Sequence, residues 1–127
     1  MRDDRSDCIL IVEDSPTEQR LMQKMLEDGG YRVLLASDGN EAVAIVQREK
    51  PALVLLDVIL PGPNGFQICR QLKSSPETRG IRIVLVSSKN QDADKFWGLK
   101  QGADEYLTKP FVAAELLASV KRQMVAS

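Results

Sequence analysis

Reactive side chains follow four apolar runs of this sequence, each directly after the run ends. They are two acids after residues 8–12, a third acid after 53–56, two hydroxyls after 81–86 and an amine after 103–108: Glu13, Asp14, Asp57, Ser87, Ser88 and Lys109. Carboxylate oxygens with room for water suit Mg²⁺, and an aspartate carboxylate can act as a nucleophile toward phosphorus. Clustered acids require such a cation, because they otherwise raise one another's pKa. These residue types indicate a site for a phosphoryl group beside a metal ion.

Each of these residues also has a purely structural interpretation. Glu13 or Asp14 would favour the positive end of a following helix, and Asp57 would serve as a cap or turn residue. Ser87 alone fits a loop, and Lys109 alone fits a solvated surface. The structural interpretation is strong for a single residue and weak for the set, since reactive groups would have to follow four runs by coincidence.

The apolar runs predict the elements that position these residues. Continuous apolar runs are typical of strands buried on both faces of a parallel sheet. We predict strands at 8–12, 31–36, 53–57, 81–86 and 103–108, and helices at 16–28, 39–50, 65–74, 92–100 and 112–124. This alternation predicts an α/β fold, a doubly wound five-stranded parallel sheet with five helices on its two faces. The reactive residues would then share the carboxyl edge of the sheet, where such folds bind ligands.

The start of the first predicted helix has a recognisable pattern. Ser15 is a capping residue, Pro16 suits the first helical position, and Glu18 stands where it would complete a capping box with Ser15. Gly29 and Gly30 end the helix. Glu18 is therefore expected to bind the backbone N–H at the start of its own helix.

Length and composition exclude several classes of protein. The 127 residues fit one domain, with 1–7 as a disordered lead-in and 8–127 as the folded part. A net charge of −1 without a basic stripe gives a nucleic-acid partner no support, and no apolar run is long enough for membrane insertion. Cys8 and Cys69 lie in no metal or redox spacing, which together with the missing signal peptide favours a reducing, cytoplasmic location. The chain has no histidine, so any phosphohistidine must come from a partner.

The motifs together resemble the response-regulator receiver domain of the CheY type, from about residue 8 to residue 125. The matching motifs are Ile11-Val12-Glu13-Asp14-Ser15, Leu56-Asp57 followed by Pro61-Gly62 and Asn64-Gly65, Val86-Ser87-Ser88, and Tyr106-Leu107-Thr108-Lys109-Pro110-Phe111. The resemblance implies a flavodoxin-like, CheY-like fold with strand order 2-1-3-4-5. It also implies a phosphoacceptor switch that catalyses only its own phosphorylation and dephosphorylation, not an enzyme with a separate substrate.

The resemblance assigns expected roles to the reactive residues. Asp57 would accept a phosphoryl group from a phosphohistidine on a sensor histidine kinase or phosphotransfer protein. Asp14, Asp57 and the backbone carbonyl of Ile59 would hold Mg²⁺, with Glu13 helping through water. Ile59 stands where a polar side chain could orient the attacking water, so we expect it to shield the phosphoryl group and lengthen its lifetime.

The remaining expected roles concern the phosphoryl oxygens and the switch. Lys109, the Ser87 hydroxyl and the Ser88 backbone N–H would bind those oxygens, and Ser87 and Tyr106 would move together on phosphorylation. The resemblance further implies a cis bond between Lys109 and Pro110, which X–Pro pairs adopt at modest cost. Glu13 and Ser87 replace the aspartate and threonine that are common in the family, and both keep the required oxygen.

A narrower likeness lies in residues 89–103, which resemble the stand-alone receivers of twitching-motility and phototaxis systems, the PilH type. A single-domain receiver would signal by phosphorylation-dependent binding of an effector protein, with Lys89, Lys95, Trp97 and Lys100 as parts of that surface. The main alternative is a phosphate sink that drains a shared kinase and has no effector.

Two further alternatives from other classes are disfavoured. An unphosphorylated scaffold would not need the complete acceptor set. A phosphoaspartate hydrolase of the haloacid dehalogenase class needs a second aspartate shortly after the first, and Asp57-Val58-Ile59 lacks one.

Overall fold

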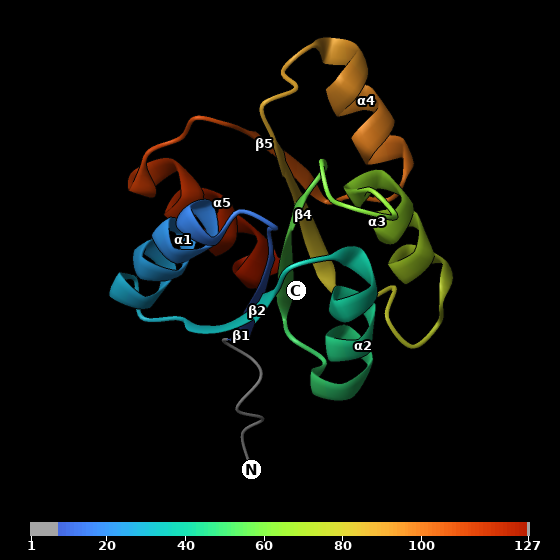
Figure 1. The fold of residues 1–127 in the computed structure, drawn as a ribbon, viewed down its shortest axis with the longest axis horizontal. Helices are drawn as coiled ribbons and strands as arrows, with labels where there is room; N and C mark the ends of the chain where they lie inside the picture. Colours follow the sequence, from blue (N-terminus) through green and yellow to red (C-terminus); the bar gives the residue numbers. More distant parts are fainter. Residues whose placement is uncertain (1–7, 127) are drawn as a thin grey trace.

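The computed structural model describes residues 8–126, so the predicted lead-in at 1–7 lies outside the described residues. One sheet of five parallel strands forms the centre of the molecule, in the order β2-β1-β3-β4-β5 (Figure 1). The strands are β1 (Cys8–Val12), β2 (Arg32–Ala36), β3 (Leu53–Asp57), β4 (Arg82–Ser87) and β5 (Glu105–Thr108). The predicted α/β fold and strand order are confirmed.

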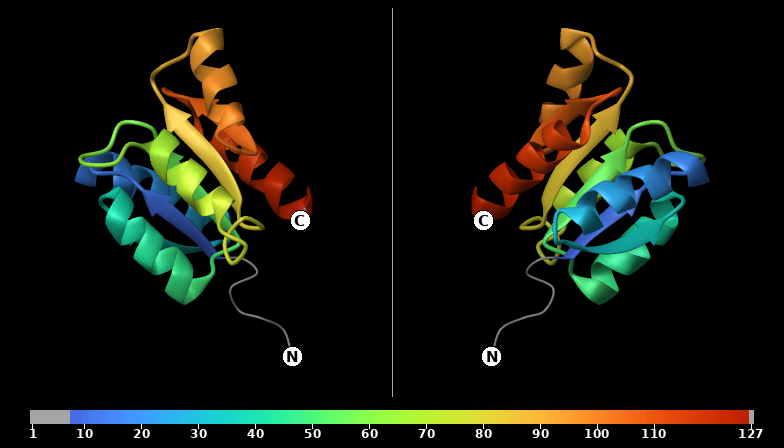
Figure 2. Two further views of the ribbon diagram at one scale, coloured as in Figure 1. Left: turned by 90° about the vertical axis from the view of Figure 1, so that its right-hand side faces the viewer. Right: turned by 90° about the vertical axis from the view of Figure 1, so that its left-hand side faces the viewer.

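Five helices alternate with the strands and cover both faces of the sheet (Figures 1 and 2). They are α1 (Pro16–Asp28), α2 (Gly39–Glu49), α3 (Gly65–Ser74), α4 (Asp92–Lys100) and α5 (Ala113–Ala126). Helices α1 and α5 pack together on one face, and α2, α3 and α4 lie on the other. The predicted helix positions hold to within two residues at each end.

Alternate residues of each central strand supply two separate cores. In β1, Ile9 and Ile11 pack with α1 and α5, whereas Leu10 and Val12 pack with α2 and α3. Both sets are fully buried, which explains why β1 is a continuous apolar run without alternation. The strand ends that carry reactive residues are therefore held by core packing on both sides.

Strand β5 begins two residues later than the sequence predicted. The carboxylate of Asp104 accepts the backbone N–H of Ile83 at 2.8 Å, and it also pairs with Lys73 Nζ at 2.9 Å and with Arg82 at 3.3 Å. The Asp104 N–H donates to the Ile83 carbonyl as in a strand, but the Asp104 side chain takes the Ile83 N–H that a strand carbonyl would otherwise bind, so the paired register starts at Glu105. The same contacts anchor the amino end of β4 to α3.

Helix α4 is the least buried helix of the five. Gly98 is its one buried residue, and Phe96, Trp97 and Leu99 are each more than half exposed. A Cβ at Gly98 would lie 2.8 Å from Leu85 Cδ1 and 3.0 Å from Tyr106 Cδ2, so the glycine lets α4 approach the sheet. An apolar surface of α4 therefore remains open to solvent.

Among the described residues, no helix combines the length and the apolar character that crossing a bilayer requires.

Candidate functional site

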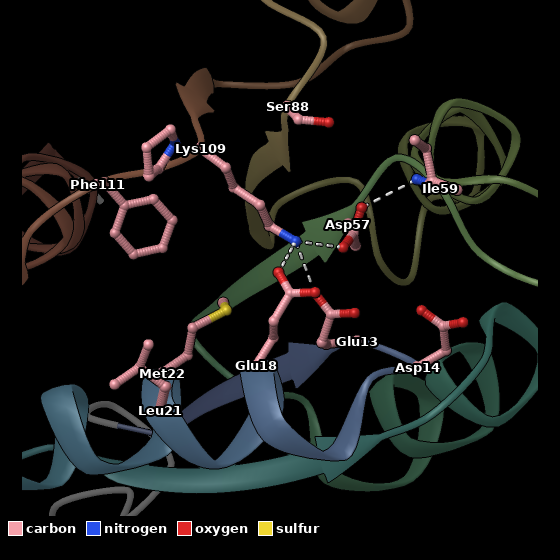
Figure 3. Close-up of a pocket in the computed structure, with 11 residues that line it drawn as sticks. Glu13, Asp14, Glu18, Leu21, Met22, Asp57, Ile59, Ser88, Lys109 and Phe111 are labelled. Atoms are coloured by element: carbon pink, nitrogen blue, oxygen red, sulfur yellow. Dashed lines mark hydrogen bonds and ion pairs between the residues drawn. The ribbon is translucent and has the colours of Figure 1, made fainter.

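A cavity of about 540 Å³ lies at the carboxyl edge of the sheet, next to the ends of β1, β3 and β5 (Figure 3). Its polar lining consists of Glu13, Asp14, Glu18, Asp57, Ser88 and Lys109. Its apolar lining consists of Leu21, Met22, Ile59, Pro110 and Phe111. The residues that the sequence placed at one edge of the sheet are therefore close together in space, except that the buried Ser87 is not among the residues that line the cavity.

Lys109 stands at the centre of the site. Its Nζ donates to Asp57 Oδ2 at 2.8 Å, to Glu13 Oε1 at 2.9 Å and to Glu18 Oε1 at 2.6 Å (Figure 3). Burial alone would lower the pKa of Lys109, but these three carboxylates raise it well above its ordinary value. The lysine is thus held as a cation. The peptide bond between Lys109 and Pro110 is cis, as the resemblance implied.

Asp57 ends β3 and is 6% exposed. Its Oδ2 binds Lys109, and its Oδ1 accepts the backbone N–H of Ile59 at 2.9 Å. The loop that follows is tied back by the Gly65 N–H, which donates to the Val58 carbonyl at 2.8 Å. The carboxylate is therefore fixed in direction at the wall of the cavity, next to the solvent-exposed side chain of Ile59.

Glu13 is buried and bridges two parts of the site. Its Oε1 accepts from Lys109, and its Oε2 accepts the backbone N–H of Ser15 at 3.0 Å. Burial raises the pKa of Glu13, and the neighbouring Asp57 raises it further, while Lys109 acts in the opposite direction. The Glu13 carboxylate is consequently part of the same network of charged groups as Asp57 and Lys109.

The predicted capping box at the start of α1 is wrong in one half. The Ser15 Oγ accepts the Glu18 N–H at 3.3 Å, as a cap should. The reciprocal contact is replaced, since the Ser15 N–H donates to Glu13 and the Glu18 carboxylate reaches Lys109. Glu18, which the sequence pattern assigned to the cap of its own helix, is thus a member of the site.

Asp14 differs from the other acids because it is exposed. It lies at the edge of the cavity, apart from the three carboxylates that bind Lys109 (Figure 3). Between residues 8 and 126, no three acidic, histidine or cysteine side chains stand close enough together to hold a metal ion by themselves. Mg²⁺ does not require three, because it binds through one or two carboxylates and keeps several waters. The hard oxygen donors of Asp14 and Asp57, beside a cavity that opens to solvent, fit that ion.

Ser87, Ser88 and Tyr106 meet at the end of β4. Ser87 is buried, and its Oγ accepts the Lys89 N–H at 3.1 Å, whereas Ser88 is exposed and lines the cavity. Tyr106 is half-buried, and its hydroxyl donates to the Lys89 carbonyl at 2.7 Å. Burial raises the pKa of the Tyr106 hydroxyl. The two residues expected to form a switch are thus connected through the backbone of one residue, Lys89.

This geometry, an aspartate beside a lysine at the carboxyl edge of a five-stranded parallel sheet, agrees with the comparison to known families. Residues 9–121 match the response regulator receiver domain family. The chain belongs to that family. Among individual proteins, it is 48% identical over 112 residues to protein PilH of Pseudomonas aeruginosa, which covers 88% of this chain and 93% of PilH.

Solved structures agree with this assignment. The receiver domain of a sensor histidine kinase from Pseudomonas aeruginosa PAO1, with a magnesium ion coordinated in its active site cleft, has a TM-score of 0.86 and 33% identity, covering 93% of this chain and 97% of that chain. The chemotaxis response regulator CheY4 of Vibrio cholerae has a TM-score of 0.86 and 28% identity, covering 91% of this chain and 97% of that chain. The CheY-like fold is therefore shared both with the receiver domain of a sensor kinase and with a chemotaxis response regulator.

Proposed function

We propose that the protein is a phosphorylation-controlled signalling switch whose phosphoacceptor is Asp57. The observation that carries this proposal is the Asp57 carboxylate at the end of β3, bound to Lys109 and open to a cavity of about 540 Å³. An oxygen of Asp57 would bond to phosphorus while the bond from phosphorus to a histidine nitrogen of the donor breaks. The electron pair of that bond leaves with the imidazole. The histidine belongs to a sensor kinase or phosphotransfer protein, because this chain has none.

Mg²⁺ is the cofactor that this proposal requires. Asp14, Asp57 and the carbonyl of Ile59 would hold it, and Glu13 would contribute through water. When bound, the ion neutralises negative charge on the transferring phosphoryl group. The magnesium ion in the cleft of the related kinase receiver supports the same chemistry here. Lys109, the Ser87 hydroxyl and the Ser88 backbone N–H would bind the phosphoryl oxygens.

The output would be a change in the contacts of Lys89. Because the Ser87 Oγ and the Tyr106 hydroxyl both bind the Lys89 backbone, a Ser87 that turns toward a phosphoryl oxygen releases one of these contacts. Tyr106 would then become buried and change the position of α4. The exposed Phe96, Trp97 and Leu99 on α4 are the apolar groups that an effector protein would cover. This surface favours the switch over a phosphate sink.

We further propose that this switch acts in a motility pathway in the cytoplasm. The protein is 48% identical to PilH over 88% of the chain, and residues 89–103 resemble the receivers of twitching-motility systems. Cys8 and Cys69 are buried thiols, which is compatible with a reducing compartment.

The first test is a mass measurement of the intact protein after incubation with acetyl phosphate and Mg²⁺. We expect one phosphoryl adduct that disappears with EDTA and in Asp57→Asn. The matched control is Asp28→Asn, which removes an exposed carboxylate on α1 and should keep the adduct. An adduct that persists in Asp57→Asn would refute the assignment of the acceptor.

A second test separates the switch from the sink. A cell lysate is passed over the protein with and without beryllofluoride, a stable analogue of the phosphoryl group, and bound proteins are compared between wild type and Trp97→Ala. The switch predicts a partner that binds only with beryllofluoride and is lost in Trp97→Ala. Rapid phosphoryl turnover with the kinase and no such partner would favour the sink.

A further inference from the structure

We infer that Glu18 is a positioning residue, whose carboxylate holds Lys109 at the mouth of the cavity and competes with the phosphoryl group for that lysine. The inference rests on the proposed function, since it concerns the step in which Asp57 accepts phosphate. It concerns the chain's own acid on α1, which neither the acceptor role of Asp57 nor the metal site requires.

The contacts of Lys109 show why a competition must occur. An ammonium group has three N–H donors and no acceptor. Glu18, Asp57 and Glu13 occupy positions for all three, at 2.6, 2.8 and 2.9 Å. The resting site therefore leaves Lys109 no donor for a phosphoryl oxygen, and one of the present contacts has to be released.

Burial identifies Glu18 as the contact that is released. The side chains of Glu13 and Asp57 are 2% and 8% exposed, so before the bond to phosphorus forms either carboxylate would lose its partner in a place with little water. The side chain of Glu18 is 49% exposed, and its carboxylate can be hydrated as soon as it leaves the lysine. The backbone of Glu18 stays in place meanwhile, because its N–H is bound to the Ser15 Oγ. Only the side chain needs to move.

The chemical step gives the exchange its direction. With acetyl phosphate as donor, an oxygen of Asp57 bonds to phosphorus, the bond between phosphorus and the acetate oxygen breaks, and acetate leaves with the electron pair. The bond to phosphorus removes the negative charge of Asp57, and the phosphoryl oxygens carry more negative charge than that carboxylate did. Lys109 can donate fully to those oxygens only when the Glu18 carboxylate no longer occupies one of its N–H groups. Glu18 thus stabilises the resting state and leaves the phosphorylated state unaffected, so that it slows phosphorylation.

Three variants test this role. Glu18→Gln removes the charge, Glu18→Asp keeps the charge but shortens the reach by one methylene, and Glu27→Gln makes the same change at an exposed position of α1 as the matched control. We measure the equilibrium affinity for beryllofluoride in saturating Mg²⁺, and the rate of phosphorylation by acetyl phosphate. A contact of this exposure predicts a gain of about two- to fivefold in both quantities for Glu18→Gln. Glu18→Asp should also bind beryllofluoride more tightly than wild type, and Glu27→Gln should equal wild type.

Each result that would overturn the role of Glu18 can be told apart from the others. Glu18→Gln equal to or weaker than wild type would overturn the inference. Glu18→Asp equal to wild type would replace competition for Lys109 by simple charge repulsion at the cavity mouth, and so overturn it as well. Mg²⁺ affinity is measured without beryllofluoride, and tighter Mg²⁺ binding by Glu18→Gln would assign the gain to the metal instead. A wild-type protein that forms no adduct and binds no beryllofluoride would refute the proposed function itself.

Discussion

Gly65 lies directly against the backbone of Asp57. A Cβ at position 65 would meet the Asp57 carbonyl oxygen and would stand 2.7 Å from the Val58 Cα and 2.9 Å from the Asp57 carbonyl carbon. These atoms are backbone atoms of the acceptor strand and its loop, so they cannot move aside as a side chain can. The glycine that begins α3 is therefore part of how Asp57 is positioned.

Gly65→Ala should destabilise the fold and disturb the acceptor together. We expect a loss of about 3 kcal/mol in the free energy of unfolding, measured with urea, because the added methyl group forces the backbone apart. Phosphorylation by acetyl phosphate should slow even where the variant is folded. Gly80→Ala is the control, since nothing lies within 4 Å of the position that its methyl group would take, and it should stay within about 1 kcal/mol of wild type. Equal stability of both variants would contradict the role assigned to Gly65.

Lys109→Met should destabilise the protein at neutral pH and less so in mild acid. The change leaves the buried Glu13 and Asp57 without their cation, which we expect to cost about 2–3 kcal/mol at pH 7. Burial already raises the pKa of Glu13, and loss of Lys109 raises it further. The folded variant then binds more protons than the unfolded chain as the pH falls toward 5, which restores part of its stability.

Urea unfolding of Lys109→Met at several pH values checks this dependence. Lys24→Met is the control, because Lys24 forms an exposed pair with Asp28 and its loss should have no measurable effect. A loss of stability in Lys109→Met, relative to wild type, that becomes larger as the pH falls from 7 to 5 would contradict a raised pKa of Glu13 in the variant.

Ile59→Asn should shorten the lifetime of the phosphorylated protein. The side chain of Ile59 is 56% exposed and lines the cavity, so an amide there can orient a water molecule toward the phosphoryl group. We expect dephosphorylation to accelerate about tenfold, less than a well-placed general base would provide. Loss of the mass adduct over time measures the effect, and Ile59→Val serves as the control that stays apolar. An unchanged or longer lifetime in Ile59→Asn would count against the shielding role of Ile59.

Glu105→Gln should reduce stability at neutral pH and lose this effect in acid. Burial by itself raises the pKa of Glu105, but its contacts with Arg122 and Gln123 lower the pKa below the ordinary value of 4.5. A lowered pKa stabilises the fold above pH 4.5, and this contribution is lost as the pH falls through the folded-state pKa. Thermal unfolding of wild type and variant should therefore differ slightly at pH 7 and converge once the pH lies below the folded-state pKa of Glu105. A difference that persists in acid would assign the effect to packing.

The apolar runs were enough to predict the strands and the edge where the reactive residues meet. Two local errors had the same cause, a side chain that binds far from its position in the chain. Glu18 matches a capping box by spacing, yet it binds Lys109, which lies 91 residues away. The start of β5 was misplaced because Asp104 binds the backbone of Ile83. Spacing describes neighbours along one helix or strand and carries no information about a partner brought in by the fold.

The contacts of Asp104 at the amino end of β4 have a mechanical consequence for the whole strand. Lys73, Arg82 and the Ile83 N–H hold that end, while the other end carries Ser87 beside the cavity. These contacts, together with the pairing of β4 to β3 and β5, oppose sliding of the strand, so the movement of Ser87 in the proposed switch would be confined to the last residues of β4. The region near Asp104 would then keep its position, and the conformational change would pass from the end of β4 to the neighbouring β5 and α4 instead of along β4.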